Sequence, residues 1–505
     1  MISCEQPLRR RSFLKVVGGA AGLTLISPLD RLIGVAEAME APLFPVDGRV
    51  ASRVLLEARS MGAGFSDLYL EKRTVTSMTL SDGKVESVEQ GIFAGVGVRA
   101  VHGDRTGYAF ADSFEEGPLV DAARNAAAIA ASASAGLAPI IFRAETPTRV
   151  VRYLRPFDEI GQDSRLAWLT RADAAARGFD PSIQQVTVTY TDEMLHFAVV
   201  NSEGLWVEDH LPLLYMRVNV NAAKDGRRGT GQERVSQRLG AEQMDDDAAG
   251  KAAIEAARMA VAMCDAREAP AGEMPVILAA GGGVLFHEAV GHGLEGDTAR
   301  RGSSFYSGKV GQVVASERVS IVEYAAMPDL RGSYNVDDEG TVPIESTLIA
   351  RGVLRGFITD RISAQALDTV RTGNGRRQSY RFPPLVRMSN TYLPNGIDPV
   401  DEMIKETKSG LYAKSLGGGE VDIATGNFTF GVLEGYLIED GRIGSPVRGA
   451  TLVGSGPEIM KRIDRVGPDI KFWPGTCGKG QWVPVSSGAP TLRISSMTVG
   501  GSAES

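Results

Sequence analysis

The chain reads Asp67-Leu68-Tyr69-Leu70-Glu71-Lys72 and, after a short gap, Ser77-Met78-Thr79-Leu80 followed by Ser81-Asp82-Gly83-Lys84. Apolar and polar residues alternate in the first two segments, as in strands with one buried face. An Asp-Gly pair between such segments is a strong hairpin signal, because both residues adopt the positive φ angles of a tight turn. Strands are expected again at Val85–Glu89 and Phe93–Val101. The region is therefore expected to begin with an antiparallel meander.

Helices are expected on both sides of this meander and after a second set of strands. The helical segments are 46–61, an Ala-rich stretch from Ser113 to about Ser134, 164–177 and 248–264, and the further strands are 185–190, 195–200 and 213–222. Mixed helices and consecutive hairpins favour an α+β fold with an antiparallel sheet. Beyond the linker-like Ala269-Pro270-Ala271-Gly272, Gly-bounded β segments dominate. We therefore predict an N-terminal α+β domain at residues 45–270 and a β-rich, metal-binding domain at 272–505.

Composition excludes several classes of protein. The chain has 505 residues, 43% of them hydrophobic, and a formal net charge of −8. A net negative charge argues against a protein that binds nucleic acid by neutralising phosphates. Three cysteines cannot form a disulfide framework. The sequence is that of a globular protein with more than one core.

The N-terminus resembles an export signal. Arg9-Arg10-Arg11-Ser12-Phe13-Leu14-Lys15 precedes an apolar run from Val16 to Leu29, and Ala36-Glu37-Ala38 offers a small-x-small cleavage site. Paired arginines before such a run are typical of the twin-arginine signal. We predict a signal peptide at residues 1–38, no stable membrane anchor after cleavage, and a periplasmic or other extracytoplasmic location. The alternative is an uncleaved segment on a cytoplasmic protein.

A candidate metal site follows a predicted buried strand, 274–278, and the tight exit Gly281-Gly282-Gly283. The next segment contains His287 and His292 in the pattern H-E-x-x-x-H. Five residues correspond to about 140° around a regular α-helix, at about 100° per residue, so the two rings would point apart. Both can face one metal only if the helix is irregular. We therefore predict an irregularity at residues 290–292, where Gly291 tolerates distortion.

A catalytic zinc usually has three protein ligands, and the chain has no histidine after His292. The candidates for the third ligand are Glu295, Asp297 and Cys477. The cysteine is favoured because it lies in a glycine-rich loop, residues 475–481, where Lys479 is expected to favour the thiolate.

These residues resemble a known family. The segment from His287 to Asp297 is similar to the metal-binding motif of the TldD subunit in the TldD/PmbA metalloprotease family. The similarity continues to the Cys477 loop through residues 304–307, 331–341, 372–377, 387–392, 417–421 and 449–456. The resemblance implies a zinc-dependent peptidase with one Zn²⁺ per chain, held by His287, His292 and Cys477, with Glu288 as general base. It also implies a heterodimer with a PmbA-type chain.

The sequence departs from the family pattern in two ways. The cysteine loop is one residue shorter than the usual C-G-K-x-G-Q, and the export signal is not part of the common pattern. A peptide or an unfolded protein segment is the expected substrate. Arg376, Arg377 and Arg387 are candidates for holding its carboxylate or main chain, whereas the acidic run 337–339 is expected to face solvent or to cap a turn.

Two other functions would use parts of the same sequence pattern. A non-catalytic binding or assembly subunit could retain zinc for structure if Glu295 or Asp297 closed the fourth position. The intact Glu288 argues against this, since a structural site needs no base. A dipeptidyl peptidase with an H-E-x-x-G-H motif would need a Glu pair on a later helix, and none follows residue 292.

Overall fold

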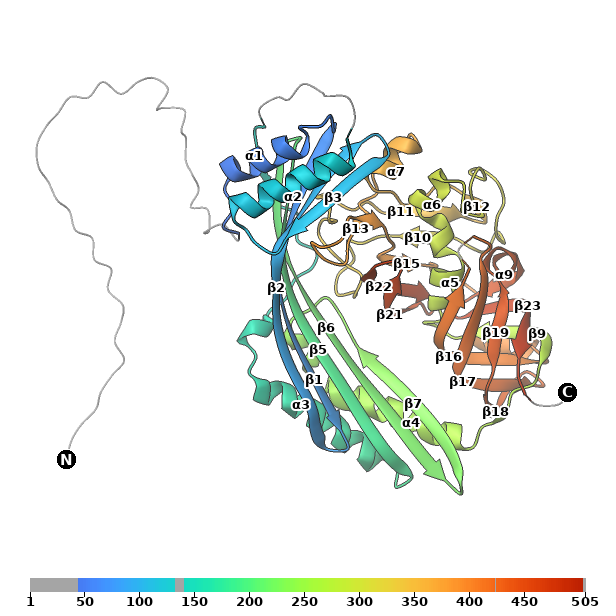
Figure 1. Ribbon diagram of the computed structural model, residues 1–505. Coiled ribbons are helices and arrows are strands. Elements are labelled where there is room, and N and C mark those ends of the chain that lie inside the picture. Colours follow the sequence, from blue (N-terminus) through green and yellow to red (C-terminus); the bar gives the residue numbers. More distant parts are fainter. Residues whose placement is uncertain (1–43, 132–139, 423, 503–505) are drawn as a thin grey trace, which may run out of the picture. The chain divides into compact units, whose positions relative to one another are not determined.

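The structure is a computed structural model that describes residues 44–131, 140–422 and 424–502 (Figure 1). The chain from Phe44 onward forms one compact unit. The predicted signal peptide at residues 1–38 lies outside the described residues. Within the described ranges, no helix has both the length and the apolar character that crossing a membrane would require.

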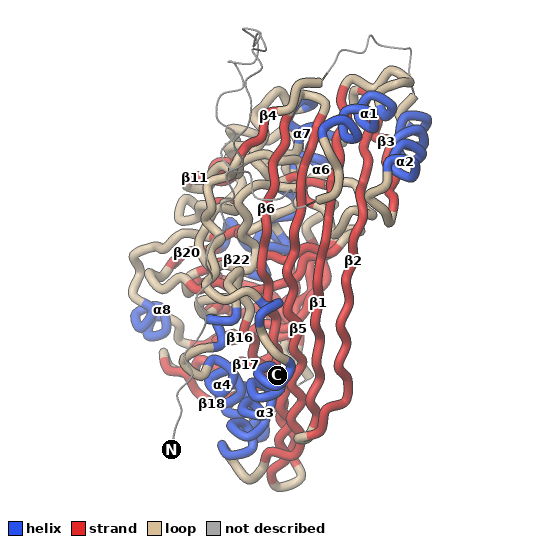
Figure 2. Tube along the Cα trace, turned by 90° about the vertical axis from the view of Figure 1, so that its left-hand side faces the viewer, coloured by secondary structure: helices blue, strands red, loops and turns tan. Residues whose placement is uncertain are grey.

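The first half of the unit is built on one long antiparallel sheet. In the described part of the chain its strand order is β3-β2-β1-β5-β6-β4, and β7 also pairs with β6. These strands and their helices are α1 (Gly48–Ala58), β1 (Phe65–Ser81), β2 (Lys84–His102), β3 (Arg105–Ala111), α2 (Glu116–Ile129), β4 (Arg143–Glu145), α3 (Gln162–Phe179), β5 (Ile183–Asn201), β6 (Leu205–Lys224), β7 (Arg227–Val235) and α4 (Ala248–Cys264). Figure 2 shows β1, β2, β5 and β6 running side by side.

The two faces of this sheet bury different partners. On one face, Leu68 and Leu70 pack with α1 and α2, while Met78 and Leu80 pack with α3 and α4. On the other face, Tyr69 packs with Tyr334, Val336 and Tyr380 from the second half of the chain. This division follows from the alternation of side chains along a strand. The part of β1 from Phe65 to Glu71 is therefore buried on both faces, whereas the part from Thr76 to Ser81 is buried on the helix-covered face alone.

Strand lengths differ from the sequence-based expectation. Residues 67–72 and 77–80, expected as two strands, belong to the single strand β1, and β5 likewise spans both of its expected segments. The polar gap in β1 stays in the sheet because Arg73 forms ion pairs with Glu71 and with Glu193 on β5. The hairpin turn at Asp82-Gly83 is confirmed, since both residues have positive φ angles of 50° and 73°. Helix α4 has the expected bounds.

The second half is rich in short strands, as expected. Its elements are β8 (Arg267–Glu268), β9 (Gly272–Leu278), α5 (Val284–Ala289), α6 (Gly296–Arg300), β10 (Ile321–Glu323), β11 (Ser346–Ala350), β12 (Val353–Leu354), α7 (Arg361–Ala366), β13 (Gly375–Arg376), β14 (Leu385–Val386), β15 (Asn390–Tyr392), α8 (Val400–Glu406), β16 (Ser409–Val421), β17 (Asn427–Glu439), β18 (Arg442–Arg448), β19 (Thr451–Ser455), α9 (Gly456–Arg462), β20 (Ile463–Val466), β21 (Lys471–Gly478), β22 (Trp482–Ala489) and β23 (Leu492–Gly500). The α+β fold class is thus confirmed.

Two sheets of this half position the candidate site. In one, the described strands follow the order β16-β9-β23-β19-β17-β18-β8, and a further pairing of β16 with β17 closes a ring that includes β9. In the other, the order is β12-β11-β10-β15-β22-β21, with β21 at one edge. Helix α5 follows β9, and its residues Leu285 and Ala289 share the core with residues of both sheets. The domain boundary near residue 271 stays a prediction.

Candidate metal centre

The two histidines lie on either side of a break between helices. Helix α5 ends at Ala289, and Val290 has φ −126° and ψ −46°, outside the helical range. A 3₁₀ turn, Gly291–Leu294, follows and carries His292. The irregularity predicted at residues 290–292 is therefore confirmed, and it takes the form of a helix that ends and restarts.

Close packing at glycines fixes this break. A Cβ atom on Gly291 would lie 2.2 Å from Sδ of Met388. A Cβ atom on Gly456, the first residue of α9, would lie 2.0 Å from the carbonyl oxygen of Ala289. Such distances are far below van der Waals contact. Only glycine at these two positions lets α9 and Met388 approach the end of α5 so closely.

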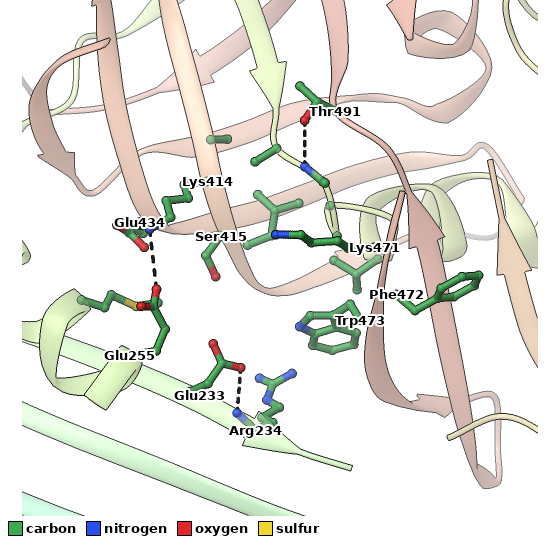
Figure 3. A pocket seen from close by; sticks show the side chains of 18 of the residues that line it. Glu233, Arg234, Glu255, Lys414, Ser415, Glu434, Lys471, Phe472, Trp473 and Thr491 are labelled. Atoms are coloured by element: carbon green, nitrogen blue, oxygen red, sulfur yellow. Dashed lines mark hydrogen bonds and ion pairs between the residues drawn. The ribbon is translucent and has the colours of Figure 1, made fainter. Parts of the chain in front are cut away.

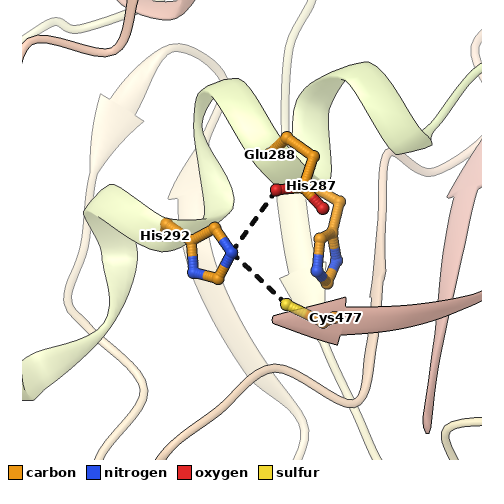
Figure 4. Close-up of side chains that lie close together, drawn as sticks. All are labelled: His287, Glu288, His292 and Cys477. Carbon is orange, nitrogen blue, oxygen red and sulfur yellow. Dashed lines mark hydrogen bonds and ion pairs between the residues drawn. The ribbon is translucent and has the colours of Figure 1, made fainter. Parts of the chain in front are cut away.

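Four side chains meet at the break (Figure 4). One ligand atom from each of His287, Glu288, His292 and Cys477 lies within 4.8 Å of the others. Sγ of Cys477 is 3.3 Å from Nε2 of His292, and a carboxylate oxygen of Glu288 is 3.5 Å from the same nitrogen. Glu288 is the most accessible member, with a side chain that is 25% exposed. Solvent can therefore reach the cluster beside Glu288.

Glu295 orients the ring of His292. Its carboxylate lies 2.9 Å from Nδ1 of His292 and accepts a hydrogen bond of 2.9 Å from Nζ of Lys479. Burial would raise the pKa of Glu295, but Lys479 and His292 lower it to about 2. The ionised carboxylate can only accept, so Nδ1 carries the proton and Nε2 is free to bind a metal.

His287 has no hydrogen-bonding partner for either ring nitrogen within the described residues, although it is only 2% exposed. Buried polar atoms are normally paired. A buried imidazole with both nitrogens unpaired, beside a thiol and a second imidazole, fits a role as metal ligand. His287 therefore passes this test of the proposed donor set.

Cys477 reaches the cluster on the hairpin of β21 and β22. Arg387, which is fully buried, donates from Nη2 to the carbonyl oxygen of Cys477 (2.8 Å) and from Nη1 to that of Gln481 (2.7 Å). Burial would raise the pKa of the Cys477 thiol, but His287 and His292 lower it to about 5. The cysteine is thus poised as a thiolate, which is the form that binds metals.

The donor set fits a divalent metal of borderline softness. Two imidazoles and a thiolate are ligands that Zn²⁺ prefers. Donor atoms around a tetrahedral Zn²⁺, at about 2.0–2.3 Å from the ion, lie roughly 3.3–3.8 Å from each other. The 3.3 Å between Cys477 Sγ and His292 Nε2 fits this spacing. The residues present can therefore hold such an ion without rearrangement of that pair.

The structure places the other candidate residues elsewhere. Asp297, like Glu295, accepts from Lys479 (2.8 Å) and is not part of the cluster. Lys479, which was expected to favour the thiolate, is held by these carboxylates, and the groups that lower the pKa of Cys477 are His287 and His292. Arg376, Arg377 and Arg387 are all buried, at 5%, 5% and 0% exposure. Arg376 donates to the carbonyl oxygen of Met388 and Arg377 to that of Asp338.

Sequence reasoning missed two supporting roles, those of Glu295 as orienting group and Arg387 as anchor of the cysteine hairpin. A carboxylate three residues after a histidine could have suggested the first, since residues i and i+3 lie on one side of a turn. No sequence signal indicates the second. The acidic run 337–339 does not face solvent, but Asp337 does cap a turn, accepting from the backbone N–H groups of Glu339 and Thr341.

Comparisons with known families cover nearly all of the described chain. Profiles of the PmbA/TldA metallopeptidase family match residues 66–134 (domain 1), 155–263 (central domain) and 271–501 (C-terminal domain). The chain is 38% identical over 447 residues to a metalloprotease TldD homologue of Haemophilus influenzae, covering 86% of this chain and 93% of that one. It is 26% identical to a zinc metalloprotease TldD homologue of Saccharolobus solfataricus, covering 89% and 99%.

Solved structures share the fold. TldE from Thermococcus kodakarensis superposes with a TM-score of 0.73 at 18% identity, covering 90% of this chain and all of that one (100%). A protein of Thermotoga maritima superposes with a TM-score of 0.75 at 20% identity, covering 90% and 99%.

Proposed function

The chain belongs to the PmbA/TldD family of metallopeptidases, and on this basis we propose that it is a zinc-dependent peptidase acting on peptides or unfolded protein segments. The observation that carries the proposal is the convergence of His287, His292 and Cys477 with Glu288 beside them. The three would hold one Zn²⁺ per chain. When bound, the ion supplies a Lewis acid that polarises the scissile carbonyl and acidifies water.

Glu288 is assigned as the general base. It follows the ligand His287 directly, and its carboxylate is partly open to solvent. Burial alone would raise the pKa of Glu288. The opposing effect of His292 and His287 is larger, so the pKa lies below its ordinary value. The ionised carboxylate can accept a proton from the attacking water and pass it to the departing amine. A purely structural site would need no such group.

The peptide is proposed to bind along β21. This strand is at the edge of its described sheet, so an extended peptide can add to it beside Cys477 by main-chain hydrogen bonds. Pro474 in this strand is consistent with an edge position, because proline cannot donate to a ladder. Of the arginines expected to hold substrate, Arg376 and Arg377 remain candidates, whereas the contacts of Arg387 favour a role in fixing the cysteine hairpin.

The decisive experiment compares Glu288→Gln with His287→Ala, using protein purified from its own cells so that any partner is retained. We expect Glu288→Gln to keep about one zinc per chain and to lose peptide hydrolysis, and His287→Ala to lose both. Exposed Glu317→Gln is the control and should leave both unchanged. Loss of zinc in Glu288→Gln would contradict its role as base. Zinc without hydrolysis in every preparation would favour the non-catalytic subunit.

A PmbA-type partner and export by the twin-arginine route are further parts of the proposal. The family relation supports the first, and the sequence of residues 9–38 supports the second. Native mass spectrometry of the purified protein should show a second subunit of different mass. Replacing Arg10 and Arg11 by lysine should retain the precursor in the cytoplasm. Detection of this chain alone in the mass spectrum would contradict the proposed partner. An unchanged location of the arginine variant would contradict export by the twin-arginine route.

A further inference from the structure

A second site is suggested by a cavity of about 160 Å³ between the long sheet and the β21–β22 hairpin. Five arginines line it, and two of them, Arg73 and Arg377, have the acidic partners Glu193 and Asp67. The other three, Arg238, Arg331 and Arg376, are 3%, 6% and 5% exposed. They come from segments far apart in the sequence. Arginines are almost never buried to this extent unless they are paired with an acid, so the partners of these three are informative.

The partners of these arginines are neutral. Arg238 donates to the carbonyl oxygens of Arg331 (3.1 Å) and Pro212 (3.3 Å). Arg331 donates to the carbonyl oxygen of Gly475 (2.8 Å) and to hydroxyls. Arg376 donates to the carbonyl oxygen of Met388 (2.6 Å). None of the three forms an ion pair with any residue that the structure describes.

Other buried arginines in the same molecule are paired. Arg99 forms ion pairs with Asp67 and Glu339, and Arg165 with Asp192. A larger cavity, of about 420 Å³, contains acidic side chains beside its basic ones (Figure 3). There Lys414 lies 3.2 Å from Glu434 and 3.6 Å from Glu255. The unpaired arginines therefore distinguish the smaller cavity from charged sites elsewhere in the described chain.

Three acids also line the cavity, Glu193, Asp337 and Asp338, but none forms an ion pair with the three arginines. Glu193 pairs with Arg73, and Asp338 accepts from the backbone N–H of Arg377. The carboxylate of Asp337 accepts backbone hydrogen bonds within its own turn, and burial raises its pKa well above the ordinary value.

Burial also lowers the pKa of Arg238 to about 9 and that of Arg331 to about 10. An uncompensated buried charge is strongly destabilising. An anionic ligand would remove this cost.

The rest of the lining indicates the kind of anion. Leu195, Leu211 and Val336 provide apolar wall, and Trp482, which is 62% exposed, stands at the rim. An inorganic ion has no apolar group that could pack against these side chains. The volume is below the roughly 300–1,000 Å³ of typical sites for drug-sized ligands. It suits a group the size of one amino-acid residue.

The cavity also has a defined place relative to the metal centre. Thr476 and Pro484 line it and are directly opposite each other on β21 and β22. Cys477 and its partner Val483 are the next pair, so their side chains point to the other face of the hairpin. A peptide along β21 would therefore have access to both the cluster and the cavity.

We propose that this cavity binds a carboxylate carried by a small apolar group, such as the C-terminal residue of a peptide. A guanidinium fork pairs with a carboxylate through two parallel hydrogen bonds. For a peptide ligand the inference rests on the proposed peptidase function. A free amino-acid derivative would present the same chemistry without it.

The test is calorimetric titration of the purified full-length protein with N-acetyl-L-leucine and with its amide. We expect the amide to bind at least tenfold more weakly than the acid, and inorganic phosphate to bind more weakly than the acid. A short peptide that ends in leucine is then titrated with a free and with an amidated C-terminus. This comparison shows whether the carboxylate that binds can be that of a peptide or only that of a free amino-acid derivative. Because binding is measured, absence of peptide hydrolysis would leave this result intact.

Variants locate the site. Arg331→Lys keeps the charge but loses the fork, and we expect at least a tenfold increase in the Kd of N-acetyl-L-leucine. Arg238→Gln should have a similar effect if the variant folds. Arg165→Lys alters a buried, paired arginine and should change the Kd less than twofold. Equal binding of acid and amide, tighter binding of phosphate, or an unchanged Kd in folded Arg331→Lys would overturn the proposal.

Discussion

Sγ of Cys477 lies 3.3 Å from Nε2 of His292, although 185 positions separate the two residues along the chain. The histidine is on a turn that follows α5, the helix after β9 of one sheet, and the cysteine is on an edge hairpin of another. The centre therefore depends on how the two sheets pack. Changes that disturb this packing should affect metal binding even where no ligand is altered.

Removal of the cysteine ligand should abolish tight metal binding. We expect Cys477→Ser to reduce the zinc content from about one per chain to less than about 0.2, because a thiolate is replaced by a weakly coordinating hydroxyl. The zinc content is measured by elemental mass spectrometry after dialysis against a weak chelator. Cys264→Ala is the matched control, since Cys264, the last residue of α4, is buried in the core that α4 shares with α3. Equal zinc loss in both variants would argue against a ligand role for Cys477.

Glu295→Gln should weaken zinc binding without removing a ligand. The amide keeps the shape of the side chain but not the charge that holds Nδ1 of His292 and Nζ of Lys479. Loss of such an orienting carboxylate typically costs 10–100-fold in metal affinity. Competition with a chromophoric chelator measures this change. An unchanged affinity in the folded variant would show that the orientation of His292 does not depend on Glu295.

Arg387→Lys should act through the hairpin. Lysine cannot donate to the carbonyl oxygens of Cys477 and Gln481 simultaneously in the geometry of a guanidinium. We expect a lower Tm and at least a tenfold loss of zinc affinity. Arg448→Lys is the control, because its pair with Glu268 is at the surface, where ion pairs contribute about 0–1 kcal/mol. Normal affinity in Arg387→Lys would contradict the anchoring role.

Gly456→Ala should destabilise the end of α5. The new methyl group would meet the carbonyl oxygen of Ala289 at 2.0 Å, so α9 and α5 must move apart. We expect a loss of about 1–3 kcal/mol in the free energy of unfolding, with reduced zinc content. Gly418→Ala is the control, because nothing lies within 4 Å of a Cβ built there. Thermal melts with and without zinc would reveal the difference between the variants.

Asp360 predicts a pH dependence of stability. It caps α7 by accepting from the N–H of Ser363 (2.7 Å), and burial, with a contribution from Glu339, raises its pKa to about 6. The native state therefore binds more protons than the unfolded state between about pH 4 and pH 6, so this group lowers stability as pH rises through that range. Two pKa units correspond to about 2–3 kcal/mol.

Asp360→Asn keeps the cap but cannot ionise. Relative to the unsubstituted protein, it should be more stabilising at pH 7.5 than at pH 4.5. Asp180→Asn is the control, because hydrogen bonds from Ser182 lower the pKa of this carboxyl below its ordinary value, so its ionisation differs little between these two pH values. A Tm difference for Asp360→Asn that is the same at both pH values would contradict the prediction.

Local structure could largely be predicted where it depends on residues that are close together in the sequence. The Asp82-Gly83 hairpin, helix α4 and the break after Ala289 all follow from spacing, periodicity and the properties of glycine. The continuity of β1 through its polar gap could not be predicted, because Arg73 stays in the sheet by pairing with Glu193 on another strand.

The potential metal ligands could be predicted from the sequence, but the residues that hold them in place could not. The pattern around His287 and the glycine-rich loop of Cys477 indicate ligands, since those residue types carry the chemistry. The anchoring of the hairpin by Arg387, and the gathering of Arg238 and Arg331 at one cavity, depend on contacts between distant segments. Nothing in the local sequence of an arginine reveals whether it will be exposed or buried without an acid.

The pairing of β9 has a consequence for biosynthesis. This strand, which leads into α5, is flanked by β16 and β23, and Leu278 pairs with Leu492, more than 200 residues later. At about 5–20 residues per second, a ribosome needs roughly 10–45 s to make that intervening chain. Until β16 is made, in the middle of this interval, the apolar β9 has neither neighbour, and it lacks β23 to the end of the interval. Newly made chains would therefore expose it to chaperones or to aggregation. Slower or interrupted translation after β9 should therefore reduce the yield of folded protein.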